Sequence, residues 1–75
     1  MTKEKLFQII SENTGVEINE ITEESRLYDE LGIDSLELEK IVAEAEAIFD
    51  TVYDRRGYSA VVTVGELYQS LTAIR

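Results

Sequence analysis

The chain has 75 residues and a net charge of -9, from 16 acidic and 7 basic side chains. This charge argues against binding to the phosphate backbone of DNA or RNA and to an anionic membrane, and it favours a partner with a basic surface. The length indicates one small domain, residues 1–75, and the hydrophobic content of 44% is typical of a folded protein. No apolar run is long enough for a membrane span, and the chain starts with an amphipathic stretch instead of a signal-peptide core, so we expect a cytoplasmic protein. We also expect a monomer.

Apolar residues recur at helical spacing in three stretches of the chain. The first stretch covers residues 2–13, where apolar side chains lie three and four positions apart and Asn13 shares their face. Thr2 can cap the start of this helix, and Gly15 can end it in a left-handed conformation. These signals together predict an amphipathic helix that begins and ends within the first fifteen residues.

Two further stretches each begin with a capping sequence. The second covers residues 35–49, and Asp34 with Glu37 resembles a capping box in which Asp replaces Ser or Thr. The third covers residues 63–73, and its start has the Thr-x-x-Glu signature. The sequence therefore predicts an all-α fold, a small helical bundle of three main helices.

The segments between the helices differ in character. Residues 16–33 form a long acidic loop, and such a loop needs anchoring in a compact domain. Residues 50–62 contain Gly57 and little periodicity, so we expect at most a short helical turn there, which would make a fourth helix of the bundle. Six apolar residues can hold the first of these segments as an ordered loop against the core: Val16, Ile18, Ile21, Leu27, Leu31 and Ile33.

Ser35 stands at the start of the second predicted helix, and little in the chain could activate it for catalysis. The chain has no histidine and no cysteine, and Lys40 lies on a different side of the helix, so we expect no catalytic residue. The acidic loop lacks the register of a calcium site, and we expect no metal. Two interpretations remain: Ser35 caps the helix, or it carries a phosphate ester, which the N–H groups of a first helical turn would favour.

The segment "LGIDSLELEKIVAEAEAIF" resembles the modification segment of acyl carrier proteins, which have an Asp-Ser-Leu triplet preceded by Leu-Gly. The similarity extends over essentially the whole chain. It implies that a phosphopantetheinyl transferase attaches 4'-phosphopantetheine from coenzyme A to Ser35. It also implies that the protein is not an enzyme and carries acyl groups as thioesters on this arm. The partner enzymes would be acyl-transferring or synthase enzymes of fatty-acid, lipid or specialised metabolite biosynthesis.

The resemblance also implies binding residues around Ser35. Acyl groups would lie between the helices, although residues on a helical face like the three pocket residues are more often plain core. The sequence departs from the fatty-acid members of the family at four positions, with positive or small side chains where acidic or bulky ones are usual, which suggests a specialised carrier. These positions are Lys40, Ala43, Arg55 and Arg56; the other expected partner-binding residues are Asp34, Leu36, Glu37 and Glu44, and the pocket residues are Val42, Ala45 and Leu71.

Two other functions fit the same residues. One is an aminoacyl or peptidyl carrier, which would use the same serine chemistry with a different cargo. The other is an unmodified acidic helical module that docks on a basic partner through its second helix. Modification of Ser35 would distinguish the two carrier functions, which require it, from the unmodified interaction module.

Overall fold

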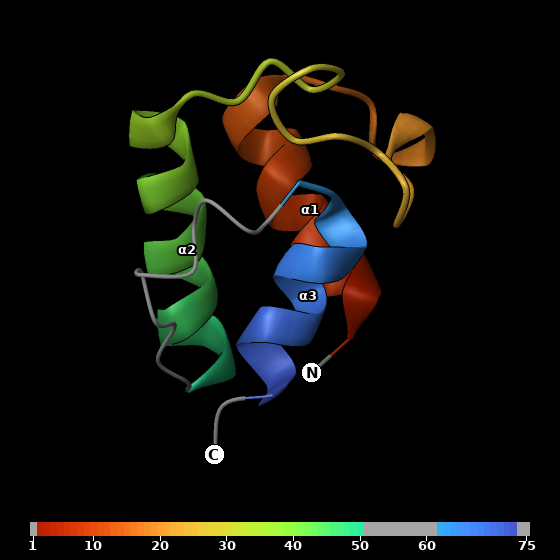
Figure 1. The fold of residues 1–75 in the computed structure, drawn as a ribbon. Helices are drawn as coiled ribbons and strands as arrows, with labels where there is room; N and C mark the ends of the chain where they lie inside the picture. The colour runs from red at the N-terminus through yellow and green to blue at the C-terminus, as the bar shows by residue number, and fades with distance from the viewer. Residues whose placement is uncertain (1, 51–61, 74–75) are drawn as a thin grey trace.

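The computed structural model describes residues 2–50 and 62–73, and these residues form a small helical bundle (Figure 1). The elements are α1 (Lys3–Thr14), a short 3-10 helix η1 (Ile18–Glu20), α2 (Ser35–Phe49) and α3 (Val64–Ala73). Within the described ranges the extended structure is a single isolated bridge between Arg26 and Thr63. The all-α prediction and its three main helices are confirmed. The helical turn expected among residues 50–62 falls on residues that lie almost entirely outside the described ranges.

The helices are arranged so that the start of α2 lies at the same end of the bundle as the long loop. Figure 1 shows α1 running toward that end and α2 and α3 running away from it, with the loop crossing over the top of the view. The beginning of α1 and the end of α3 lie at the opposite end. The beginning of α2 is therefore separated from the beginning of α1 and the end of α3 by the length of a helix.

The core is apolar and takes residues from all three helices and from the loop. Ile21, Leu27 and Ile33 anchor the loop in the core, and Val16 and Leu31 pack against it in part, as the sequence predicts. Ile18 differs from the prediction, because 45% of it is exposed at the start of η1. The helical members of the core are Leu6, Ile9, Ile10, Leu38, Ile41, Val42, Ala45, Val64, Leu67 and Leu71.

The ends of α1 follow the capping residues that the sequence indicates. The Thr2 hydroxyl accepts a hydrogen bond from the N–H of Lys5 at 3.3 Å. Gly15 has a φ of 81°, and its N–H donates to the carbonyl of Ser11 at 2.9 Å. Because φ is positive there, glycine is the residue that closes the helix with least strain.

The start of α3 has the complete capping box that its sequence predicts. The Glu66 carboxylate accepts hydrogen bonds from the N–H groups of Val62 at 2.7 Å and Thr63 at 3.1 Å. The Thr63 hydroxyl accepts one in return from the N–H of Glu66 at 3.2 Å. The two backbone donors stabilise the charged carboxylate, and they lower the pKa of Glu66 below its usual value.

The loop is tied to the start of α3 by backbone hydrogen bonds between residues far apart in sequence. The N–H of Leu27 donates to the carbonyl of Val62 at 2.9 Å, and the N–H of Gly65 donates to the carbonyl of Glu23 at 2.8 Å. A Cβ at position 65 would lie 3.1 Å from the same Glu23 oxygen, so a glycine permits this approach. The loop therefore keeps a fixed shape on its way to α2.

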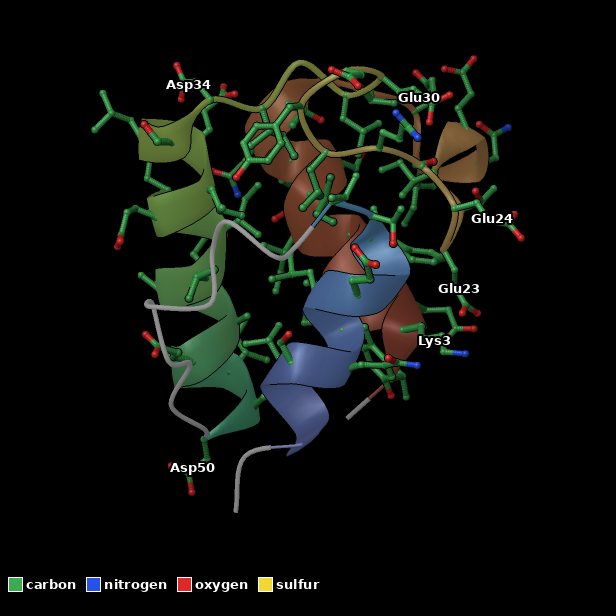
Figure 2. All side chains as sticks on the ribbon, in the orientation of Figure 1. Lys3, Glu23, Glu24, Glu30, Asp34 and Asp50 are labelled. Atoms are coloured by element: carbon green, nitrogen blue, oxygen red, sulfur yellow. The ribbon has the colours of Figure 1, made fainter. Side chains whose placement is uncertain are left out.

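One ion pair adds a side-chain link between the loop and α1. The Lys3 Nζ lies 2.7 Å from the Glu23 Oε2, and Figure 2 shows the two side chains on the flank of the bundle. The same ammonium lies 5.7 Å from the centre of the Tyr68 ring. The hydrogen bond and the charge of Glu23 raise the pKa of Lys3. Both charged side chains are about half exposed to solvent, so this pair contributes little to stability.

Candidate modification site at Ser35

Ser35 is the first residue of α2, and its side chain is exposed. The residue that caps the helix is its neighbour Asp34, whose Oδ1 accepts a hydrogen bond from the N–H of Glu37 at 2.8 Å. Figure 2 shows Asp34 at the outer corner of the bundle, where the loop meets α2. The interpretation that Ser35 caps the helix is therefore wrong, because the carboxylate before it does so. The Ser35 hydroxyl is left exposed beside that cap.

The chain reaches Ser35 through a fixed turn. Gly32 has a φ of 68°, and a Cβ added there would meet no atom within 4 Å, so the requirement for glycine is conformational and the space beside it is open. Ile33 is buried, and its N–H donates to the carbonyl of Leu27 at 3.0 Å. The N–H of Leu27 donates in turn to the carbonyl of Val62, just before the start of α3. The position of Ser35 is thus set by contacts with the core and with α3.

The first turn of α2 offers a favourable environment for a phosphate ester. Its backbone N–H groups have no partner in a preceding turn, and the positive end of the helix dipole lies there. Asp34 satisfies the N–H of Glu37, while those of Ser35 and Leu36 remain without a partner inside the helix. An exposed serine beside N–H donors fits a bulky group attached through phosphate to Ser35.

The other predicted partner-binding residues are not equally available. Leu36 is 76% exposed, Glu37 is half-buried, and Lys40 and Ala43 are exposed on α2. Glu44 is exposed too, but its Oε1 accepts a hydrogen bond from the Nδ2 of Asn13 in α1 at 3.0 Å. The structure thus directs one expected binding carboxylate toward a neighbouring helix. Arg55 and Arg56 lie outside the described residues.

Asn13 is the residue with a role at this surface that sequence reasoning missed. Its Nδ2 also donates to the carbonyl of Ile9 at 2.9 Å, so the side chain joins α1 to α2. The available signal was an amide side chain on the otherwise apolar face of α1. A polar residue on an inward face needs a hydrogen-bond partner, and α2 supplies it.

The predicted pocket residues Val42, Ala45 and Leu71 are fully buried in the core. Two of them lie on the inner face of α2 and the third lies on α3. This location agrees with plain core packing.

Two findings bear on other kinds of site. Over residues 2–50 and 62–73, no group of three or more acidic, histidine or cysteine side chains is arranged to hold a metal ion. In the same part of the chain, no helix is both long and apolar enough to cross a membrane.

The sequence matches the family of the phosphopantetheine attachment site over residues 4–71. An acyl carrier protein of Thermotoga maritima is 40% identical over 63 residues, which cover 84% of this chain and 78% of that protein. The chain belongs to the acyl carrier protein family. Another acyl carrier protein, from an Exiguobacterium species, is 34% identical over 71 residues, covering 89% of this chain and 90% of that protein.

The fold agrees with this family. A provisionally assigned acyl carrier protein from Mycobacterium tuberculosis superposes with a TM-score of 0.82 at 30% sequence identity, covering 96% of this chain and 97% of that one. The protein is accordingly a carrier and not an enzyme, and its cofactor is phosphopantetheine. It works with a phosphopantetheinyl transferase and with partner enzymes, as members of this family do. The cofactor supplies the thiol that this cysteine-free chain lacks.

Proposed function

We propose that Ser35 is the attachment residue for 4'-phosphopantetheine. The observation that carries the proposal is the exposed hydroxyl of Ser35 at the first position of α2, beside a cap made by another residue. Within the described part of the chain, the remaining serines are less accessible: Ser25 is buried, and Ser11 and Ser70 are partly buried. Ser11 also donates its hydroxyl proton to the carbonyl of Val16 at 2.6 Å. Ser35 is therefore the described serine that a transferase reaches with least rearrangement.

The attachment step needs a base from outside this chain. In the step, the Ser35 Oγ forms a bond to the phosphorus that bears the pantetheine, and the bond from that phosphorus to the nucleotide half of coenzyme A breaks. The hydroxyl proton must leave as the new bond forms. The chain has no histidine to accept it, and the neighbouring Asp34 carboxylate is engaged in the cap of α2, so we infer that the base belongs to the transferase. Within this chain, the α2 cap positions Ser35, and the N–H groups of the first turn stabilise the negative charge of the ester.

Asp34, Leu36 and Glu37 are the proposed contact residues for the transferase. Asp34 and Leu36 are exposed on either side of Ser35, and Glu37 follows half a turn later. Together they present two carboxylates and one apolar side chain to an enzyme that covers the start of α2. A basic enzyme surface would complement this region and the overall negative charge.

The cargo is proposed to be an acyl group bound as a thioester and delivered to enzymes of fatty-acid, lipid or specialised metabolite synthesis. The names of the similar proteins support an acyl cargo. Val42, Ala45 and Leu71 are proposed to line the space for that cargo, because they are apolar and lie where α2 and α3 meet the core. We further propose that residues 1–75 act as one acyl-carrier domain, that the protein is a monomer, and that it works in the cytoplasm.

The test of carriage is a loading experiment with an acyl-coenzyme A and a broad-specificity phosphopantetheinyl transferase. We expect the protein to gain the mass of the acylated arm, and we expect hydroxylamine to remove the acyl part and leave the arm. Hydroxylamine cleaves thioesters, whereas the phosphate ester to Ser35 withstands it. A protein that gains no mass with a transferase active on another carrier would instead support the unmodified interaction module.

A further inference from the structure

Lys40 is an exposed residue of α2 and follows Ser35 by five positions. Five residues of α-helix correspond to about 7.5 Å along the axis and a rotation of roughly 140°, so the two Cα atoms lie about 9 Å apart. The two side chains leave the helix on different sides, and the Lys40 ammonium therefore does not adjoin the Ser35 hydroxyl. A group at the end of a flexible arm on Ser35 is not restricted in this way.

The Lys40 side chain has no ion-pair partner among residues 2–50 and 62–73. Glu44 lies four residues after Lys40, the spacing at which helical ion pairs form. Its carboxylate instead accepts the hydrogen bond from Asn13 of α1 at 3.0 Å. The Lys40 Nζ is thus open to solvent, and it can act as a nucleophile once it has lost a proton.

The other lysines of the chain, Lys3 and Lys5, lie at the far end of the bundle. Both belong to the first turn of α1, which begins at the end opposite to the start of α2 (Figure 1). The Lys3 Nζ is also held by the Glu23 carboxylate at 2.7 Å. This hydrogen bond raises the pKa of Lys3 and so favours its unreactive, charged form. Lys40 is therefore the lysine nearest to Ser35.

We propose that Lys40 is a self-acylation site, whose Nζ takes the acyl group from the phosphopantetheine arm of its own chain. This inference rests on the attachment proposed at Ser35. The arm joins the Ser35 Oγ to the thioester sulfur through about fourteen bonds, which span roughly 16 Å when extended. That reach exceeds the separation of about 9 Å between Ser35 and Lys40. Lys3 and Lys5 lie a helix length away, about 18 Å for the 12 residues of α1.

The step is an acyl transfer from sulfur to nitrogen. The Lys40 ammonium first releases a proton to water, and the neutral Nζ then forms a bond to the thioester carbonyl carbon. The bond from that carbon to sulfur breaks, and the departing thiolate takes up the proton that the nitrogen loses. The products are an amide on Lys40 and a free thiol on the arm. Because both groups belong to one chain, they meet at an effective concentration on the order of millimolar.

The test is incubation of the acyl-loaded protein alone at mildly alkaline pH, where more of the lysine is neutral. Intact mass confirms loading first, and failure to load would count against the function proposed for Ser35 instead. Hydroxylamine then removes every acyl group that is still a thioester, so acyl mass that persists is an amide, and tandem mass spectrometry locates it. Lys40→Arg keeps the charge and removes the nucleophile, and Lys5→Arg in α1 is the matched control.

We expect the persistent acyl group on Lys40, in about tenfold larger amount than on Lys3 or Lys5. Lys40→Arg should lose this amide, and Lys5→Arg should form it like wild type. If loaded wild type lost its acyl group to water and formed no amide on Lys40, the proposal would be wrong. Equal acylation of Lys3 or Lys5, or of any other amine of the chain, would overturn it too, because proximity to Ser35 would then have no effect.

Two comparisons test whether the transfer occurs within one chain. Isotopically labelled Ser35→Ala, which has Lys40 but no arm, is mixed with loaded wild type at about 10 μM. Its Lys40 should be acylated about a hundredfold more slowly, because this concentration is far below the effective one. The double variant Lys40→Arg, Ala47→Lys moves the lysine to an exposed position about 18 Å along α2 from Ser35, where acylation should be slower than at Lys40. Equal acylation of the labelled chain, or an equal rate for the displaced lysine, would contradict transfer by reach of the arm.

Discussion

Asp34 combines two roles that substitution can separate. Its Oδ1 caps α2 by accepting the hydrogen bond from the N–H of Glu37 at 2.8 Å, and its charge lies beside the proposed attachment residue Ser35. Asp34→Ala removes both the hydrogen bond and the charge. Asp34→Asn keeps an oxygen that can cap the helix and removes only the charge.

The structure allows the two losses to be estimated. Loss of a cap hydrogen bond costs about 1 kcal/mol of unfolding free energy. Loss of a negative charge at a helix start costs roughly 0.3–1 kcal/mol at low salt. Asp34→Ala should therefore lose about 1–2 kcal/mol and Asp34→Asn less than about 1 kcal/mol. For a domain of this size, 1 kcal/mol corresponds to a change in Tm of about 4–8 °C.

Thermal and urea unfolding followed by circular dichroism measure the stabilities, and transferase kinetics with coenzyme A measure recognition. We expect Asp34→Asn to retain most of the stability of wild type while its kcat/KM for the transferase falls as far as that of Asp34→Ala. If Asp34→Asn were as unstable as Asp34→Ala, the assignment of the cap hydrogen bond would be refuted. Wild-type modification rates in both variants would refute the role in recognition.

Three further predictions concern the rest of the fold. Glu66 has a lower pKa in the folded protein than its usual 4.5, so its carboxylate stabilises the fold above that pH and loses this effect as the pH falls through the lower, folded value. Glu66→Gln should therefore be less stable than wild type at pH 7, and the difference in Tm should shrink as the pH falls below 4.5 and vanish below the lower, folded pKa. A difference that stays constant with pH would contradict the assigned cause. Gly65→Ala should lower Tm, because the alanine Cβ would lie 3.1 Å from the Glu23 oxygen that accepts the hydrogen bond from the Gly65 N–H. This loss is expected although alanine is the better helix former by about 1 kcal/mol. A higher Tm would show that Glu23 moves away from the added Cβ at little cost. Added salt or divalent cations should raise Tm by screening the charge of -9, and a Tm that falls steadily with moderate salt would show that specific ion pairs matter more.

The parts of the fold that depend on local chemistry could be predicted from the sequence. The caps at Thr2, Asp34 and Thr63 act within three or four residues of themselves, so the short-range pattern was sufficient to start each helix. The bounds predicted for α2, residues 35–49, agree with the structure. Ser35 was placed at the start of a helix for the same reason.

The features that sequence reasoning missed join residues far apart in the chain. The hydrogen bonds from the loop to the start of α3 and the contact between Asn13 and Glu44 depend on how the helices pack, which no local pattern encodes. Ile18 was expected to help anchor the loop, but η1 leaves it half exposed. Its hydrophobicity alone could not show which side of a short helical turn would face the core.

The most direct test of the account is the intact mass of the protein after incubation with coenzyme A and an active phosphopantetheinyl transferase. We predict one added phosphopantetheine in wild type, located on Ser35 by tandem mass spectrometry, and none in Ser35→Ala. Ser11→Ala, which removes a partly buried serine in α1, should be modified like wild type. Circular dichroism would confirm that the Ser35→Ala variant folds, as expected while Asp34 still caps α2. An arm attached to folded Ser35→Ala, or to another residue of wild type, would contradict the account.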